Sequence, residues 1–288
     1  MVSKKSTTSK AMGATASAGG GNRVRAGRPK AAKTANRLPG VPFDLPRVNA
    51  EQLRRAAALR DMLAESYPDA HCELNHSNAH ELLIATICSA QTTDVGVNKC
   101  TPALFAAYPT PADYAKATPE EIEPYIRTIG LFRSKAKSIC QTTKELTEKF
   151  GGQVPRTMDE LLTLRGVARK TANVVLGNAF GINVGFVVDT HVHRLSQRLG
   201  LVPVGTPVAQ CEKLLMACFA AYQDEWCMLS HRLIFHGRRG CPARGMPTGC
   251  CSQHQICRGL GDRCELRVTA KSKGGGKAGP KSAGKAQS

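Results

Sequence analysis

The chain has 288 residues, 42% of them hydrophobic, and a formal net charge of +18. That length allows one large domain or two modest ones, with enough apolar side chains to bury a core. A run of about 18 apolar residues and a secretory signal are both absent, which argues against a membrane span and against a small secreted disulfide scaffold.

Positive charge is concentrated at the two ends of the chain. Residues 1–43 hold nine Lys and Arg and no acid, and residues 266–288 hold six and no acid. Segments so rich in Gly, Ala, Ser and Lys bury too little apolar surface to fold, so we expect disordered arms at 1–47 and 268–288. Such arms raise the affinity for a polyanion such as DNA. An organelle transit peptide over residues 1–37 is the alternative, because this segment is basic and free of acid.

Signals for helix starts recur through the middle of the chain. Asn49, with Gln52 three residues later, predicts a helix that ends before Pro68. Residues 81–87 predict a more buried helix, and the polar residues 89–94 interrupt it before the next helix. Capping hydroxyls precede a proline at the first helical position in the Thr-Pro pairs 110–111, 118–119 and 206–207. Sustained alternation of β-branched residues is missing, so we predict an all-α fold.

The stretch 164–176 reads Leu-Arg-Gly-Val-Ala-Arg-Lys-Thr-Ala-Asn-Val-Val-Leu. It predicts two helices joined by a tight turn at Gly166, the second beginning at about Arg169 and aiming backbone N–H groups at a phosphate. Lys170 falls in the first turn, where the helix dipole favours the neutral, nucleophilic amine. The carboxylate of Asp189 can assist proton movement and stabilise positive charge. A solvated lysine and a helix-capping aspartate are the alternative, and only the joint pattern favours the chemical interpretation.

These two motifs resemble the helix-hairpin-helix and the following aspartate of the endonuclease III DNA glycosylases. Arg165 stands where that family has proline, and Ala168 where it has the second glycine of the hairpin. If that position needs a positive φ, an alanine costs about 1 kcal/mol. The resemblance covers about residues 48–267 and implies two all-α lobes with a cleft between them: a six-helix lobe over 70–182, and a second lobe from 48–69 and 183–267.

The resemblance implies a bifunctional DNA glycosylase and AP lyase of base excision repair. Lys170 would displace a flipped, oxidised pyrimidine at C1′ to form a Schiff base, with Asp189 assisting, and β-elimination would then cut the strand. Gly166, Ala168 and Arg169 of the hairpin would bind the DNA backbone.

Two further loops resemble those that enter the minor groove in this family. The first loop is Ser-Ala-Gln-Thr-Thr-Asp at 89–94, and the resemblance implies that its Gln91 fills the gap left by the flipped base. The second is Ile-Gly-Leu-Phe-Arg-Ser-Lys-Ala at 129–136, and the resemblance implies that its Leu131 is an apolar wedge inserted into the base stack. Ordinary interhelix loops are the alternative. Arg133, Lys135 and Lys137 are expected either to contact phosphate or to form a solvated helix face.

His-Gly-Arg at 236–238, followed by Cys241, resembles the segment that leads into the [4Fe–4S] cluster of the family. The spacing departs from the family pattern. Cys241, Cys251 and Cys257 fit the family pattern whether it is aligned from its first ligand or from its last. For the fourth ligand we prefer Cys264 to Cys250, because Cys250 is next to Cys251 and neighbouring side chains in extended chain point apart. Zinc on four thiolates is the rival interpretation, and free structural cysteines are a third. Arg238 and nearby arginines are expected to face phosphate.

The partner expected from this resemblance is double-stranded DNA with damaged bases or abasic sites, bound by a monomer in the cytoplasm, at the nucleoid. Two alternatives stay open: a non-catalytic helix-hairpin-helix DNA-binding module, and a paralogue with altered base specificity. The presence of Lys170 argues against a monofunctional adenine glycosylase, which keeps the aspartate but usually lacks this lysine.

Overall fold

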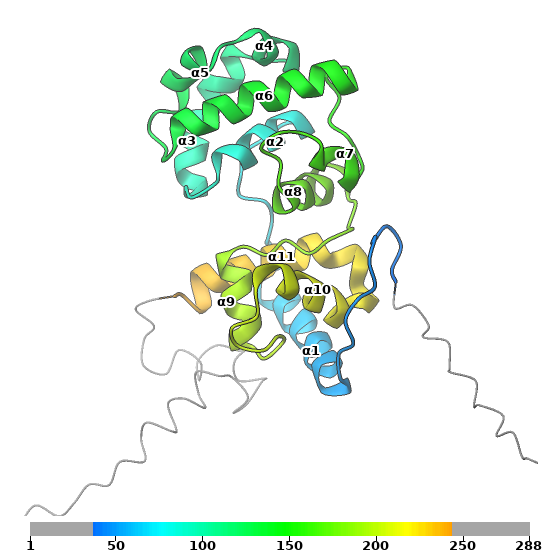
Figure 1. Ribbon diagram of the computed structural model, residues 1–288. Helices are drawn as coiled ribbons and strands as arrows, with labels where there is room; N and C mark the ends of the chain where they lie inside the picture. Colours follow the sequence, from blue (N-terminus) through cyan, green and yellow to red (C-terminus); the bar gives the residue numbers. More distant parts are fainter. Residues whose placement is uncertain (1–36, 244–288) are drawn as a thin grey trace, which may run out of the picture. The chain divides into compact units, whose positions relative to one another are not determined.

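The computed structural model describes residues 37–243, and within that range all regular structure is helical (Figure 1). The all-α prediction is confirmed, and no helix of this part of the chain is long and apolar enough to cross a membrane. The helices are α1 (Ala50–Ser66), α2 (Ala79–Cys88), α3 (Asp94–Ala107), α4 (Pro111–Lys116), α5 (Pro119–Ile126), α6 (Phe132–Phe150), α7 (Met158–Leu162), α8 (Arg169–Phe180), α9 (Thr190–Arg198), α10 (Val208–Cys218) and α11 (Trp226–Phe235), with a 3₁₀ segment η1 (Ala220–Glu225) and a π turn η2 (His236–Gly240). The expected terminal arms fall largely outside these residues.

Local capping signals position most helix starts. The side chain of Asn49 accepts a hydrogen bond from the Gln52 N–H at 2.8 Å, and the Gln52 side chain accepts from the Asn49 N–H at 3.0 Å, which confirms the capping box. The threonine cap before the Thr-Pro start of α4 is confirmed as well. Thr118 is the N-cap of α5, where its N–H donates to the Glu121 carboxylate at 2.8 Å. The prediction for Thr206 was wrong. Its hydroxyl donates to the Pro203 carbonyl in the preceding turn, so α10 begins at Val208 without a side-chain cap.

The buried apolar side chains form two separate cores. One is built from α2 to α8, with Leu83, Tyr114 and Ile139 fully buried; the other comes from α1, α9, α10 and α11, with Leu59 and Trp226 fully buried. Figure 1 shows these two groups of helices. Seven helices lie between residues 70 and 182, where the resemblance implies six, and two of them are short.

An extended segment joins the two cores. Phe186 and Val188 are buried in one core and Val187 in the other, because successive side chains of an extended chain point to opposite sides. The Val187 N–H donates to the Ser230 hydroxyl at 3.2 Å. This segment leads directly into Asp189, which therefore lies where the two cores meet.

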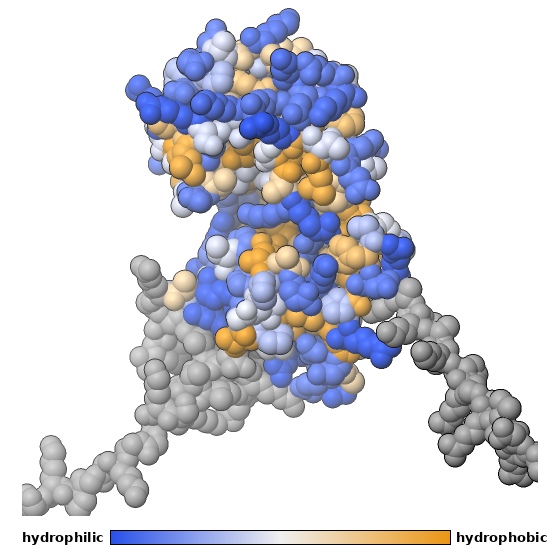
Figure 2. Space-filling model, in the orientation of Figure 1, coloured by the Kyte–Doolittle hydropathy of each residue, from blue (hydrophilic) through white to orange (hydrophobic). Residues whose placement is uncertain are grey.

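Helix α6 is the long amphipathic helix of its group. It buries Ala136, Ile139 and Leu146 and exposes Lys137 and Lys144. Hydrophilic residues cover the face of α6 that is visible in Figure 2. This helix is important for the site because its buried side also contacts the hairpin between α7 and α8.

Candidate active site

The hairpin between α7 and α8 has the geometry that its sequence predicts. Gly166 has φ +83°, and a Cβ there would approach the Ser138 Cβ to 3.2 Å, so both backbone conformation and space favour glycine. Ala168 is the N-cap of α8 with φ −87°, so the cost considered for an alanine there does not arise. No side chain caps this helix, which leaves the N–H groups of its first turn available to a phosphate.

Arg165, which replaces the proline of the family pattern, is accommodated by α6. Its backbone N–H donates to the Glu145 carboxylate at 2.9 Å, and its carbonyl accepts a hydrogen bond from the Thr142 hydroxyl. A proline could not make the first of these bonds because it has no N–H.

Lys170 and Asp189 line the same cleft. Lys170 is exposed in the first turn of α8, and Asp189 is half-buried as the N-cap of α9, where its carboxylate accepts from the Val192 N–H at 2.7 Å. The cleft has a volume of about 1070 Å³. Its lining comes from both groups of helices: His71, Glu73, Ser89, Gln91, Thr92, Thr93, Asp94, Val95, Asn98, Lys170, Val188, Asp189, Thr190, His191, His193, Val208 and Arg238. The structure thus places three predicted site residues, Gln91, Lys170 and Asp189, around one cavity.

Sequence reasoning missed two further carboxyl groups in this cleft, those of Glu73 and Asp94. Asp94 is the first residue of α3, and burial raises the pKa of its carboxyl; Asp189 acts in the same direction, whereas Lys170 opposes the shift. Arg238 donates to Asp94 at 2.6 Å and also forms an ion pair with Glu73. Arg238 therefore does not present a free charge in this cleft, because two acids neutralise it. The position of Asp94, directly after the Ser-Ala-Gln loop, was the available signal.

Gln91 and Leu131 share an unusual backbone conformation. Within residues 37–243 they are the only non-glycine residues with positive φ, at 54° and 59°. This conformation costs about 1 kcal/mol for a residue with a Cβ, and such strain concentrates at functional sites. A Cβ on Gly130 would lie 3.9 Å from the Gln91 carbonyl oxygen, so the two loops are neighbours. Leu131 is 58% exposed, which leaves a large apolar side chain facing solvent.

Two cations that the sequence assigned to DNA or solvent have other partners. Lys135 is buried and donates to the Thr92 hydroxyl at 2.8 Å, so it holds the Gln91 loop against α6 rather than forming a solvated face. Burial lowers the pKa of Lys135. Arg169 forms an ion pair with Glu212 at 2.9 Å, and its guanidinium lies 5.3 Å from the Phe43 ring centre. The structure therefore places Arg169 in a contact with α10.

Leu131→Gly is expected to stabilise the fold while it impairs base excision. Glycine adopts φ +59° without strain, so the free energy of unfolding should rise by up to about 1 kcal/mol in urea titrations. If Leu131 is the wedge that the resemblance implies, excision should fall about tenfold or more, because no apolar side chain would then offset the cost of unstacking a base. Leu131→Ala is the matched control: it removes the wedge but keeps the strain. Equal excision by all three proteins would contradict a wedge role.

Cys241 is the candidate metal ligand that the structure describes. It is buried, its Sγ accepts a hydrogen bond from Arg198 at 3.3 Å, and its carbonyl accepts one from Arg194 at 2.7 Å. Cationic neighbours stabilise a thiolate, the form in which cysteine binds metals, so this position fits a cluster ligand. Cys251, Cys257 and Cys264 lie outside the described residues.

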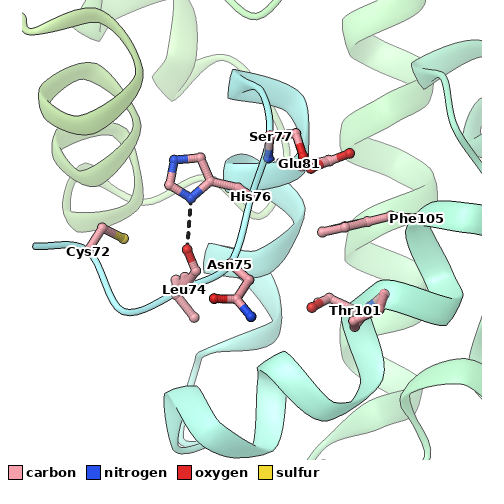
Figure 3. Close-up of a pocket in the computed structure, with 9 residues that line it drawn as sticks. Cys72, Leu74, Asn75, His76, Ser77, Glu81, Thr101 and Phe105 are labelled. Atoms are coloured by element: carbon pink, nitrogen blue, oxygen red, sulfur yellow. Dashed lines mark hydrogen bonds between the residues drawn. The ribbon is translucent and has the colours of Figure 1, made fainter.

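A separate groove of about 590 Å³ lies beside the segment that leads into α2 (Figure 3). Two of its polar side chains form hydrogen bonds with nearby backbone groups. The His76 ring nitrogen Nδ1 hydrogen-bonds the Leu74 carbonyl at 2.8 Å, and Glu81 accepts from the Ser77 N–H at 2.6 Å. These bonds shape the turn that leads into α2. The cleft at Lys170 is therefore the better candidate for chemistry.

Comparisons with known proteins show the family of this chain. Residues 84–220 match the HhH-GPD superfamily of base excision DNA repair proteins. The chain is 47% identical over 208 residues to endonuclease III of Synechocystis, covering 72% of this chain and 94% of that protein, and 43% identical over 195 residues to endonuclease III of Escherichia coli, covering 68% and 90%. Two solved structures each match with a TM-score of 0.69 over 78% of this chain and all of theirs: a non-covalent endonuclease III–DNA complex at 42% identity and a trapped covalent endonuclease III–DNA intermediate at 43%.

Proposed function

We propose that Lys170 and Asp189 carry the reaction of this chain, which belongs to the endonuclease III family of base excision repair DNA glycosylases and AP lyases. The observation that supports these roles is the shared cleft, where an exposed lysine on one group of helices and a half-buried aspartate from the segment joining the cores line one cavity. The proposed substrate is double-stranded DNA that carries an oxidised pyrimidine. The proposed place of action is with that DNA, in the cytoplasm at the nucleoid.

The reaction that these residues would perform begins with nucleophilic displacement. The Lys170 amine attacks C1′ of the flipped nucleotide, the bond from C1′ to the base breaks, and the base leaves with the electron pair and takes up a proton. Asp189 stabilises the developing positive charge at the sugar and accepts a proton from the amine. Opening of the sugar ring then yields the imine.

Strand cleavage follows from the same imine. The imine acidifies the C2′ hydrogens, and loss of one as a proton expels the 3′ phosphate as the C3′–O bond breaks. Water then hydrolyses the imine and returns the free lysine. Gln91 and Leu131 would fill the gap left by the flipped base, and the hairpin residues Gly166 and Ala168 would present backbone N–H groups to a phosphate.

Membership of the family implies a metal cofactor, and we propose a [4Fe–4S] cluster held by Cys241, Cys251, Cys257 and Cys264. The cluster would supply a cross-link that folds the C-terminal loop. The buried, cation-flanked Cys241 fits a thiolate ligand.

Protein purified anaerobically should contain about four iron atoms and four acid-labile sulfides per chain. Cys257→Ala should lose most of both, because cluster assembly needs four ligands, whereas Cys250→Ala should keep them. Stoichiometric zinc without iron would contradict the cluster and favour the rival tetrahedral site.

Borohydride trapping tests the proposed function most directly. The whole protein is incubated with duplex DNA that contains thymine glycol, or a plain abasic site, and sodium borohydride reduces any imine to a stable adduct. An adduct on both substrates is expected. An adduct only at the abasic site would remove the oxidised-pyrimidine assignment, and binding without any adduct would favour the non-catalytic DNA-binding module.

A further inference from the structure

We propose that Arg165 is an additional DNA-binding residue of this chain, whose guanidinium forms an ion pair with one backbone phosphate beside the hairpin. The inference rests on the proposed function, since it takes the hairpin as the surface that DNA contacts. A proline at this position could not supply such a contact. Arg165 would therefore add a cationic contact to the backbone N–H groups of the hairpin.

The backbone of Arg165 is held on both sides. Its N–H donates to the Glu145 carboxylate at 2.9 Å, and its carbonyl accepts from the Thr142 hydroxyl. The next residue, Gly166, has little free space, because a Cβ there would lie 3.2 Å from the Ser138 Cβ. Because the backbone is already fixed, binding a phosphate costs rotamer entropy of the side chain but no further ordering of the turn.

The guanidinium of Arg165 is exposed and has no ion pair within residues 37–243. The carboxylate of Glu145, which touches the backbone of this turn, also pairs with Lys149 at 3.3 Å. Arg169 and Arg238, by contrast, are neutralised by acids. Arg165 therefore presents an uncompensated charge on the hairpin, with the planar donor geometry that suits a phosphate.

The position of Arg165 limits which phosphate it can reach. Leu131, the proposed wedge, precedes α6, and Thr142, which binds the Arg165 carbonyl, lies 11 residues later in the chain. At a rise of 1.5 Å per residue, that stretch of helix spans about 16 Å. Phosphates of one strand recur about every 3.4 Å along the duplex axis, so the contacted phosphate lies within about five nucleotides of the flipped base.

The salt dependence of DNA binding measures this contact. Full-length wild type and Arg165→Gln are titrated onto a duplex with an uncleavable abasic-site analogue at several salt concentrations. Glutamine keeps the N–H bond to Glu145 but removes the charge. The slope of log K against log salt should fall in magnitude by about 0.9, so that the wild-type advantage shrinks about 3.5-fold between 50 and 200 mM salt. Arg165→Lys should keep the wild-type slope. Lys116→Gln, a change at an exposed cation on α4, is the matched control and should also keep it.

A scan of neutral methylphosphonates along both strands then locates the phosphate. At one position within about five nucleotides of the lesion, the substitution should weaken binding by the wild type but add nothing in Arg165→Gln. An unchanged slope in Arg165→Gln, or additive effects at every position, would overturn the contact.

Borohydride trapping of the wild type distinguishes a failure of the proposed function from a failure of the Arg165 contact alone. Without an adduct but with a reduced slope in Arg165→Gln, the proposed chemistry fails while the Arg165 contact stands. With an adduct but an unchanged slope, only the Arg165 contact fails.

Discussion

Lys170→Gln is expected to abolish the borohydride-trapped adduct and to slow strand cleavage at an abasic site by at least about 10³-fold. Glutamine has a similar length but cannot form an imine, so both covalent steps are lost together. Because Lys170 is exposed in the first turn of α8, the substitution should change the free energy of unfolding by less than about 0.5 kcal/mol. Trapping gels and single-turnover cleavage measure the first effect, and urea titration the second.

Lys170→Arg is the control that separates charge from nucleophilicity. It keeps the positive charge beside the DNA, so affinity for a duplex should stay near that of the wild type, while the adduct disappears. Full cleavage by Lys170→Arg would contradict the imine mechanism, because arginine cannot form the imine. An adduct that persists in Lys170→Gln would show that another amine is the nucleophile.

Asp189→Asn is expected to slow excision of thymine glycol by about 10²- to 10⁴-fold, the range for loss of a group that moves a proton. Trapping at a preformed abasic site should suffer less, because the base has already left. Asparagine also caps helices well, so the hydrogen bond from the Val192 N–H, 2.7 Å in the native protein, should be kept. Stability should therefore stay close to that of the wild type.

Asp189→Ala shows what the cap alone contributes. It removes both the charge and the acceptor for the Val192 N–H, so it should lower the free energy of unfolding by about 1 kcal/mol in addition to slowing excision. If Asp189→Asn excised thymine glycol at the wild-type rate, Asp189 would be only a helix cap. The two variants thus separate the chemical role of this carboxylate from its structural role.

Features that depend on a few neighbouring residues were accessible from the sequence. The capping box of Asn49 and Gln52, the turn at Gly166 and the start of α8 at Arg169 are made within a span of four residues or fewer, so local patterns predict them. Thr206 shows the limit of such patterns, since a turn through Pro203 uses the hydroxyl that a cap would need.

Features that depend on distant partners were not accessible in this way. Arg238 reaches Asp94 across 144 positions of the chain, and Arg169 reaches Glu212 across 43. Lys135 is buried because α6 packs against the Gln91 loop. The polar, basic sequence around Lys135 does not predict that contact. The strained conformation of Leu131 is likewise held by its surroundings.

The sequence by itself determined the helical class and the hairpin, because both follow from short motifs or local periodicity. It also singled out Lys170 and Asp189, which the structure places in one cleft. Only the tertiary structure decided which cationic side chains remain unpaired and available to bind DNA. Arg169, Arg238 and Lys135 have partners from distant segments, whereas Arg165 keeps an unpaired guanidinium within the described chain. The physical reason is that neutralisation of a charge depends on distances of a few ångströms, and packing sets those distances between residues far apart in the chain.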